Sequence, residues 1–418
     1  MFYSFLKVLV RFTLKIFYRK IFITGLEHIK TDTPQLIASN HPNGFLEPLI
    51  MACFFPKPLH FLVRGDVFDN PVLKPMLRST NQIPIFRFRD GFSKLRENSQ
   101  NMDESIQVLL DKKNLLIFAE GGTESIKKLR PLQKGISRIA FQAMEKNPAL
   151  DLEILPVGIN FTYPTKFNTE VMLKIGKPLK AHDYLDVYHE DNKLGHENLL
   201  SDLYDEMKKN IIHLNNQQRI KTFEKLAIIL RSIKLYPHLP IYRNDEEPLM
   251  SEKKLAETLD KISENNYDEI KDQLKKIESE MEKENISLAD LLKTPPGFGR
   301  IIFFVAGFIP FLFGIILHAL PIGLAYYFTK NKINQKEFKA SILMVSSLIL
   351  CLIYYIILII IILAMEIPLY WFVICILCGW WSLIYWQLFS STYFRSSDQI
   401  NYFKEQTHLI LFNMKNLI

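Results

Sequence analysis

Short apolar runs alternate with helix-like segments between residues 21 and 185. Strand candidates lie at residues 35–38, 60–63, 82–86, 115–118, 154–159 and 171–175. Helical stretches lie near residues 46–54, 68–79, 103–112 and 134–147. This alternation predicts an α/β domain over residues 21–195, with a largely parallel sheet and flanking helices. Such a domain builds its site from the loops at the carboxyl ends of its strands.

The chain begins with a segment of a different pattern, residues 1–20. Cations recur there every four positions among apolar residues: Lys7, Arg11, Lys15 and Arg19. The pattern predicts an amphipathic helix in a membrane interface, with its cations toward anionic head groups. A helix packed on the protein's own core is the alternative. The segment is unlike a secretory signal, which carries an uninterrupted apolar core after its charges.

Charged, helix-rich sequence fills residues 196–296, with a break at 236–240. Mixed-sign runs of this kind are usually solvated helix faces. We therefore expect a charged helical arm here and assign it no chemistry.

Strongly apolar sequence follows the arm. Within residues 340–392, the stretches 341–364 and 369–390 are each long enough to cross a bilayer as a transmembrane helix. Residues 297–329 are also apolar, but Pro310, His318 and Pro321 interrupt them. Four lysines follow this third segment, at positions 330, 332, 336 and 339. A full crossing would place them outside, against the positive-inside rule, so we expect a re-entrant or interfacial segment. Residues 393–418 are then a cytoplasmic tail.

Composition narrows the function. The formal net charge of +7 comes without an Arg/Lys cluster interleaved with aromatics. A membrane surface with anionic lipids therefore explains the excess better than nucleic acid does. Three of the four cysteines lie in the apolar C-terminal region, and no disulfide is suggested, which fits a reducing compartment. His182, His189 and His196 recur every seven positions, but we assign them to a solvated loop and expect neither a metal site nor a cofactor.

A histidine and a carboxylate stand six positions apart just after the run at 35–38. Turn signals follow His41, and we expect Asn43 to cap the next helix. His41 would then lie at the carboxyl end of a strand, and Glu47 in the first turn of a helix. This arrangement can hold an imidazole in one tautomer while its other nitrogen faces a substrate, as a general base requires. A turn histidine followed by a capping acid is the alternative.

Two arginines mark a second segment, residues 81–91. Arg87 and Arg89 follow a predicted strand. A guanidinium at such a position suits a phosphate, because its planar fork makes paired charge-assisted bonds. Surface arginines in a loop are the alternative.

A third segment runs from the strand at 115–118 into Glu120, Gly121 and Gly122. Glycines let the backbone approach a ligand closely, and their amides can bind an anion. A plain strand turn with solvated lysines is the alternative. The basic residues that follow are Lys127, Lys128, Arg130, Lys134 and Arg138.

Taken in order, these segments resemble the glycerolipid acyltransferase family, the 1-acylglycerol-3-phosphate and glycerol-3-phosphate O-acyltransferases of bacterial type. The resemblance covers roughly residues 20–180. The family's first block is His, four residues, then Asp, and one branch has one more residue between them. Residues 40–47, Asn-His-Pro-Asn-Gly-Phe-Leu-Glu, are similar to that longer form, with Glu47 in place of Asp. That branch also tends to carry a hydrophobic C-terminal extension, as this chain does.

The other blocks carry the resemblance further. Arg87 matches the block-two arginine, Glu120 and Gly121 match the Glu-Gly of the Phe-Pro-Glu-Gly block, and Pro156 matches the block-four proline. This chain lacks the proline before Glu120, and it lacks the arginine often found after Glu-Gly-Thr.

The resemblance implies a membrane-bound enzyme of phospholipid biosynthesis. It would transfer a fatty acyl group from acyl-CoA or acyl carrier protein to a hydroxyl of lysophosphatidate (lysophosphatidic acid) or glycerol-3-phosphate. His41 would be the general base and Glu47 its partner, with no Ser or Cys nucleophile. The expected location is the inner (cytoplasmic) membrane of the cell, multi-pass, with the active site on the cytoplasmic face. The expected substrate-binding residues are Arg87, Arg89, Glu120, Gly121, Gly122, Lys127 and Arg130.

Two alternatives stay open. The acceptor can instead be an amino-acid lipid without phosphate, because the third block is weakened. The chain can also be a non-catalytic membrane scaffold that retains the fold, because Glu47 replaces the family's Asp. A thioester hydrolase is disfavoured by the lack of a Gly-x-Ser-x-Gly elbow.

Overall fold

The computed structural model describes residues 2–85, 92–394 and 397–415. Its contacts divide the chain into two compact units. The first unit comprises Met1–Pro164, Thr169–Ile212 and Tyr242–Glu246, and the second comprises Thr165–Asn168, His213–Ile241 and Glu247–Ile418.

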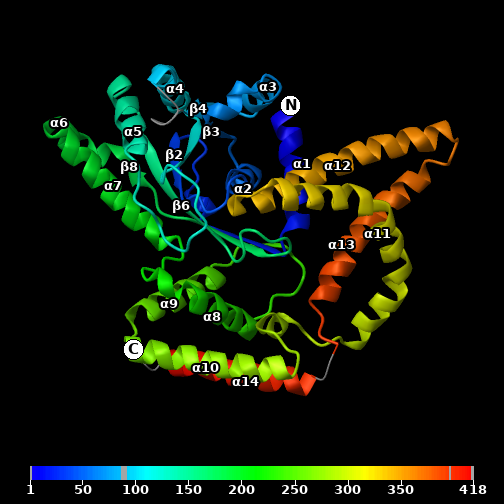
Figure 1. The fold of residues 1–418 in the computed structure, drawn as a ribbon. Helices are drawn as coiled ribbons and strands as arrows, with labels where there is room; N and C mark the ends of the chain where they lie inside the picture. The colour runs from blue at the N-terminus through cyan, green and yellow to red at the C-terminus, as the bar shows by residue number, and fades with distance from the viewer. Residues whose placement is uncertain (1, 86–91, 395–396, 416–418) are drawn as a thin grey trace. The chain divides into compact units, whose positions relative to one another are not determined.

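One mixed sheet organises the first unit (Figure 1), in the order β4-β3-β5-β2-β6-β7-β1-β9, with β8 beside β6. Neighbouring strands are parallel, except that β6 runs antiparallel to β7 and β8. The predicted α/β fold with a largely parallel sheet is confirmed. The strands are β1 (Lys20–Thr24), β2 (Gln35–Ser39), β3 (Leu59–Arg64), β4 (Gln82–Ile85), β5 (Asn114–Phe118), β6 (Glu153–Phe161), β7 (Glu170–Ile175), β8 (Leu179–Lys180) and β9 (Tyr242–Arg243).

Strand β2 is buried along its whole length between β5 and β6. Leu36 and Ala38 belong to the hydrophobic cluster that includes residues of α4, α5 and α7. Burial of a leucine side chain such as that of Leu36 contributes about 1.5–3 kcal/mol. Because side chains alternate along a strand, Ile37 and Ser39 lie on the opposite face, and His41 follows on their side. The helices of this unit are α1 (Phe2–Phe17), α2 (Leu46–Phe54), α3 (Leu73–Ser79), α4 (Phe92–Leu110), α5 (Gly135–Lys146), α6 (Leu185–Glu190) and α7 (Asn192–Lys209).

Helix α1 is amphipathic, but two of its cations do not point where the sequence suggested. Lys7 Nζ donates to the Phe55 carbonyl at 2.7 Å, and Arg11 lies over the Phe54 ring at 4.9 Å. Apolar side chains of the helix face outward instead, at Phe5 and Val8, which are 64% and 72% exposed. The prediction that the cations face head groups is therefore wrong for Lys7 and Arg11, because both contact the segment at the end of α2.

The second unit contains most of the segment expected to form a charged helical arm, residues 196–296, but residues 196–212 lie in the first unit, where Leu199, Leu203 and Met207 join the hydrophobic cluster. The arm helices of the second unit are α8 (Ile220–Ile233), α9 (Glu247–Lys261) and α10 (Glu264–Lys283). The C-terminal helix α14 (Ser397–Lys415) packs against α8 and α10, with a hydrogen bond between Ser232 Oγ and His408 Nε2 at 3.0 Å.

Three further helices of the second unit are long and apolar enough to cross a membrane: α11 (Phe298–Lys332), α12 (Lys336–Ala364) and α13 (Tyr370–Ser390). The predicted spans at 341–364 and 369–390 lie in α12 and α13. The third segment forms one helix, α11, which contains Pro310 and Pro321 and bends along its length (Figure 1). Proline removes a helix hydrogen bond and kinks the helix.

The two ends of this apolar region meet. Thr294, just before α11, pairs with Thr392, just after α13. The Thr294 N–H donates to the Ser391 carbonyl at 3.1 Å, and the Tyr393 N–H donates to the Thr294 carbonyl at 2.9 Å. Arg300 Nη1 reinforces the junction by donating to Thr294 Oγ1 at 2.7 Å. The chain therefore enters and leaves the apolar region at one place.

Candidate active site

His41 lies two residues beyond the carboxyl end of β2, as the sequence predicted. Its side chain is 14% exposed, and its Nδ1 lies 3.6 Å from Glu47 Oε1. That separation is slightly longer than a hydrogen bond, and catalytic hydrogen bonds are often long before substrate binds. The geometry directs Nδ1 toward the carboxylate and leaves Nε2 as the nitrogen for a substrate proton.

Glu47 is fully buried in the first turn of α2. Its Oε1 also accepts the backbone N–H of Asn43. Burial raises the pKa of the Glu47 carboxyl, and the neighbouring His41 opposes that rise. A cation on His41 is thus the main charge that stabilises ionised Glu47.

Asn43 does not cap α2, contrary to the expectation from its turn position. The helix has Phe45 at its N-cap and no side-chain cap bond. Asn43 Nδ2 donates instead to the Pro164 carbonyl at 2.6 Å. The side chain therefore ties the motif to the loop after β6.

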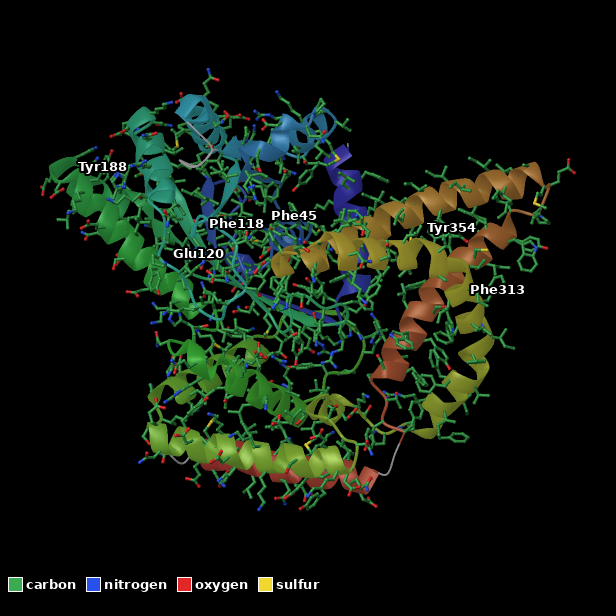
Figure 2. The ribbon with its side chains drawn as sticks, viewed as in Figure 1. Phe45, Phe118, Glu120, Tyr188, Phe313 and Tyr354 are labelled. Atoms are coloured by element: carbon green, nitrogen blue, oxygen red, sulfur yellow. The ribbon has the colours of Figure 1, made fainter. Side chains whose placement is uncertain are left out.

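Glu120 joins the first and third motifs. The parallel register pairs Ser39 with Phe118, so His41 and Glu120 follow at matching positions. Glu120 Oε2 accepts the His41 backbone N–H at 3.1 Å. The carboxylate also binds Arg130, through its backbone N–H at 2.9 Å and its Nη2 at 3.0 Å. Figure 2 labels Glu120 and Phe118, the latter at the end of β5.

The positive charge of Arg130 is already compensated by acidic side chains of the protein. Besides Glu120, its guanidinium donates to the Gly122 carbonyl and lies 3.7 Å from Glu124 Oε2. The sequence predicted a phosphate contact for Arg130, and in the structure its guanidinium contacts these protein groups. We expect Arg130 to hold the loop in shape.

The two glycines differ in their roles. Gly121 has φ +70°, and a Cβ there would lie 2.7 Å from Gln133 Cγ, so this position requires glycine. Its N–H donates to the Phe118 carbonyl at 3.1 Å and is therefore not available for the anion binding that the sequence suggested. A Cβ on Gly122 would lie 3.5 Å from Arg130 Nη1.

Of the remaining predicted site residues, the structure describes only Lys127. Arg87 and Arg89 lie outside the described residues. Lys127 Nζ donates to the Phe161 carbonyl at 2.6 Å, which brings this cation to the end of β6.

Cys53 and His196 are both buried, and their surroundings indicate a role in the fold. Burial raises the pKa of the Cys53 thiol to about 12, which suits the expected core residue and not a nucleophile. His196 is buried in α7 and bonds Ser137 Oγ through Nδ1 at 2.8 Å. The expectation of a solvated loop at His196 is wrong, because the ring packs against Phe141.

Comparison with known proteins identifies the class of the first unit. Residues 20–160 match the family model described as Acyltransferase. Glycerol-3-phosphate O-acyltransferase 1 of Saccharomyces cerevisiae is 34% identical over 64 residues, which cover 15% of this chain and 8% of that protein. An uncharacterized acyltransferase of Schizosaccharomyces pombe is 29% identical over 75 residues, 18% of this chain and 11% of that protein. The crystal structure of the 1-acyl-sn-glycerophosphate acyltransferase PlsC from Thermotoga maritima aligns with 19% identity and a TM-score of 0.33, over 45% of this chain and 72% of that one.

The chain therefore carries an acyltransferase domain. The predicted resemblance to the glycerolipid acyltransferase family is confirmed for this domain. The matched segments span only about a tenth of the length of these curated relatives.

Proposed function

We propose that the chain is a membrane-bound O-acyltransferase of phospholipid biosynthesis that transfers an acyl group from a thioester to a hydroxyl of a glycerophosphate. The observation that carries the proposal is the pairing of His41 with a buried carboxylate at the carboxyl edge of the sheet. The family model over residues 20–160 supports acyl transfer as the reaction class.

In the proposed reaction, His41 Nε2 removes the hydroxyl proton as the oxygen attacks the thioester carbonyl carbon. The C–S bond then breaks, and the thiolate leaves with the proton that His41 returns. Glu47 stabilises the imidazolium between these two proton transfers. The burial of Glu47 strengthens this stabilisation. An ionised carboxylate removed from water is stabilised most when the imidazole beside it carries a positive charge. The enzyme forms no covalent intermediate in this scheme.

Acceptor binding requires a cation at the same edge of the sheet. We propose Arg87, with Arg89, as the phosphate ligands, because Arg130 is neutralised by Glu120. Among the described residues, Lys127 also brings a cation to the end of β6, where its Nζ donates to the Phe161 carbonyl. Lysophosphatidate and glycerol-3-phosphate both present the required hydroxyl and phosphate.

The junction at Thr294 and Thr392 supports the membrane placement that we propose. Since both ends of the apolar region meet, the chain between them crosses a membrane an even number of times. In this proposal, α12 and α13 make the two crossings, and the helix α11, which contains Pro310 and Pro321, enters and returns. The lysines at 330–339 then lie on the cytoplasmic side with the acyltransferase domain, in the inner membrane of the cell.

A labelling experiment tests this topology. A cysteine at position 334, in a background without the four native cysteines, should react with a membrane-impermeant maleimide only after the cells are opened. A cysteine at 366 is the matched control and should react in intact cells. Labelling of position 334 in intact cells would contradict the proposal.

The reaction is tested with purified protein in lipid and labelled palmitoyl-CoA. Glycerol-3-phosphate and lysophosphatidate are offered in parallel, and products are identified by mass spectrometry. We expect lysophosphatidate or phosphatidate, respectively, with one acceptor strongly preferred. If neither acceptor gives a product, even with acyl carrier protein as the donor, the glycerophosphate proposal is overturned. The remaining alternatives are then an acceptor without phosphate and a non-catalytic scaffold.

A further inference from the structure

The His41 imidazole lies flat against the ring of Phe118. The two ring centroids are 3.8 Å apart, and the ring planes differ by 11°. Most aromatic pairs in proteins are edge-to-face or offset, with centroids 4.5–7 Å apart. This stack is closer and more parallel than usual, so the Phe118 ring lies against one face of the imidazole.

The sheet itself creates this contact. Phe118 is the last residue of β5, and the register places it beside Ser39 of β2. His41 follows Ser39 by two residues, so both rings project from the same face of the sheet. The Phe118 carbonyl accepts the Gly121 N–H at 3.1 Å, which fixes the turn that begins there.

Three contacts from residues 118–124, the end of β5 and the loop after it, therefore hold His41. Its backbone N–H donates to Glu120, its carbonyl accepts the Glu124 N–H at 3.1 Å, and Phe118 covers its ring. The first two fix the main chain of His41. Phe118 is the one of the three that acts on the imidazole, whose χ2 rotation is otherwise broad and roughly two-fold.

We propose that Phe118 is a positioning residue for His41, which holds the imidazole plane with Nδ1 toward Glu47 and stabilises the cation that forms when Nε2 takes the acceptor proton. This inference rests on the proposed role of His41 as the base. An aromatic face attracts a cation placed against it, and the attraction grows when water is excluded. Stacking acts most strongly in the transition state, because the charge on the ring develops there.

The first test separates the aromatic face from simple packing. Phe118→Leu removes the π face and keeps an apolar side chain, whereas Phe118→Tyr keeps the face. The full chain in lipid is assayed for acyl transfer at saturating and limiting acceptor. We expect Phe118→Leu to lower kcat by about 3- to 30-fold, with KM changed less than kcat, and Phe118→Tyr to retain kcat near that of the wild type. Wild-type kcat in Phe118→Leu, or an equal loss in both variants, would overturn the proposal. If Phe118→Leu does not fold, Phe118→Met provides the same comparison.

The second test does not depend on activity. Histidine ring protons are observed by NMR in protein labelled with ¹³C-histidine, and the His41 signal is assigned by its loss in His41→Gln. Ring-current shielding by Phe118 should shift this signal upfield in the wild type and in Phe118→Tyr. It should move downfield in Phe118→Leu, while the other histidine signals stay in place. An unmoved His41 signal would overturn the stacking itself. A moved signal in a protein without acyltransferase activity would instead show that the proposed function has failed.

Discussion

Replacing Glu120 with alanine should destabilise the first unit, because this carboxylate binds three donors. It accepts the backbone N–H groups of His41 and Arg130 and the Arg130 guanidinium, and its side chain is only 4% exposed. Leaving a buried donor unpaired costs about 1–3 kcal/mol, and breaking a buried ion pair costs about 3–5 kcal/mol. Arg130 is 22% exposed, so water recovers part of this loss. We therefore expect a cost of about 2–4 kcal/mol in the free energy of unfolding.

Glu124→Ala is the matched control in the same loop. Its carboxylate also faces Arg130, but it is 53% exposed and 3.7 Å away. Exposed pairs of this kind contribute about 0–1 kcal/mol. For a unit of this size, the expected loss of unfolding free energy lowers the Tm of Glu120→Ala by about 5–15 °C. The Tm of Glu124→Ala should be nearly unchanged.

The assay must report on the first unit alone. All four tryptophans lie in α13 of the second unit, so intrinsic tryptophan fluorescence would follow the wrong part of the molecule. Cys53 lies in the first unit and is 2% exposed. In a background that lacks the other three cysteines, a fluorogenic thiol reagent becomes bright as Cys53 is exposed on heating. Equal melting of Glu120→Ala and Glu124→Ala would refute the structural role of the Glu120 carboxylate and return Glu120 to the substrate-binding role predicted from the sequence.

Three further predictions follow from single contacts. Glu47→Gln should lower kcat by about 10²–10⁴-fold, because the imidazolium loses its counter-charge, whereas Glu47→Asp should retain more activity than Gln; steady-state rates of the two variants decide this. Burial, with help from Arg243, lowers the pKa of Lys20 from 10.5 to about 8. The unfolded chain then binds more protons between these values, so unfolding free energy should rise as pH rises through this window, and Lys20→Met should remove the slope in calorimetric scans. Gly307→Leu should separate α11 from α13 and change the tryptophan emission, since a Cβ at position 307 would lie 2.5 Å from Trp381 Cζ2. A Cβ at Gly323 would have no atom within 4 Å, so Gly323→Leu is the control and should leave the emission unchanged.

Local pattern was enough to predict six of the nine strands that the structure describes. All six predicted strands are present, because runs such as 115–118 are apolar, short and bounded by turn residues. Strand β1 was missed because it begins only two residues after α1, at the residue where the predicted N-terminal helix ended, and its short apolar run was left unassigned. Strand β9 has two residues and depends on pairing with β1, a contact more than 200 positions away that no local pattern encodes.

The candidate site was predicted by residue type but not by partner. His41 and Glu47 lie close together as predicted, because their spacing spans one turn and the start of a helix. The role of Glu120 was not foreseen, since its partners come from another strand and from Arg130 ten positions later. The stack on Phe118 was also missed, although the register of two parallel strands would have indicated it once their pairing was known.

The most direct test of the central claim is the rate of acyl transfer in His41→Ala, measured beside His182→Ala, which changes an exposed histidine of the same unit. Both proteins are purified in lipid, shown to melt like the wild type, and given labelled palmitoyl-CoA with the preferred acceptor. Our account predicts that His41→Ala loses at least about 10²-fold in rate while His182→Ala does not. A folded His41→Ala protein that works within a few-fold of the wild type would contradict the role of His41 as the general base.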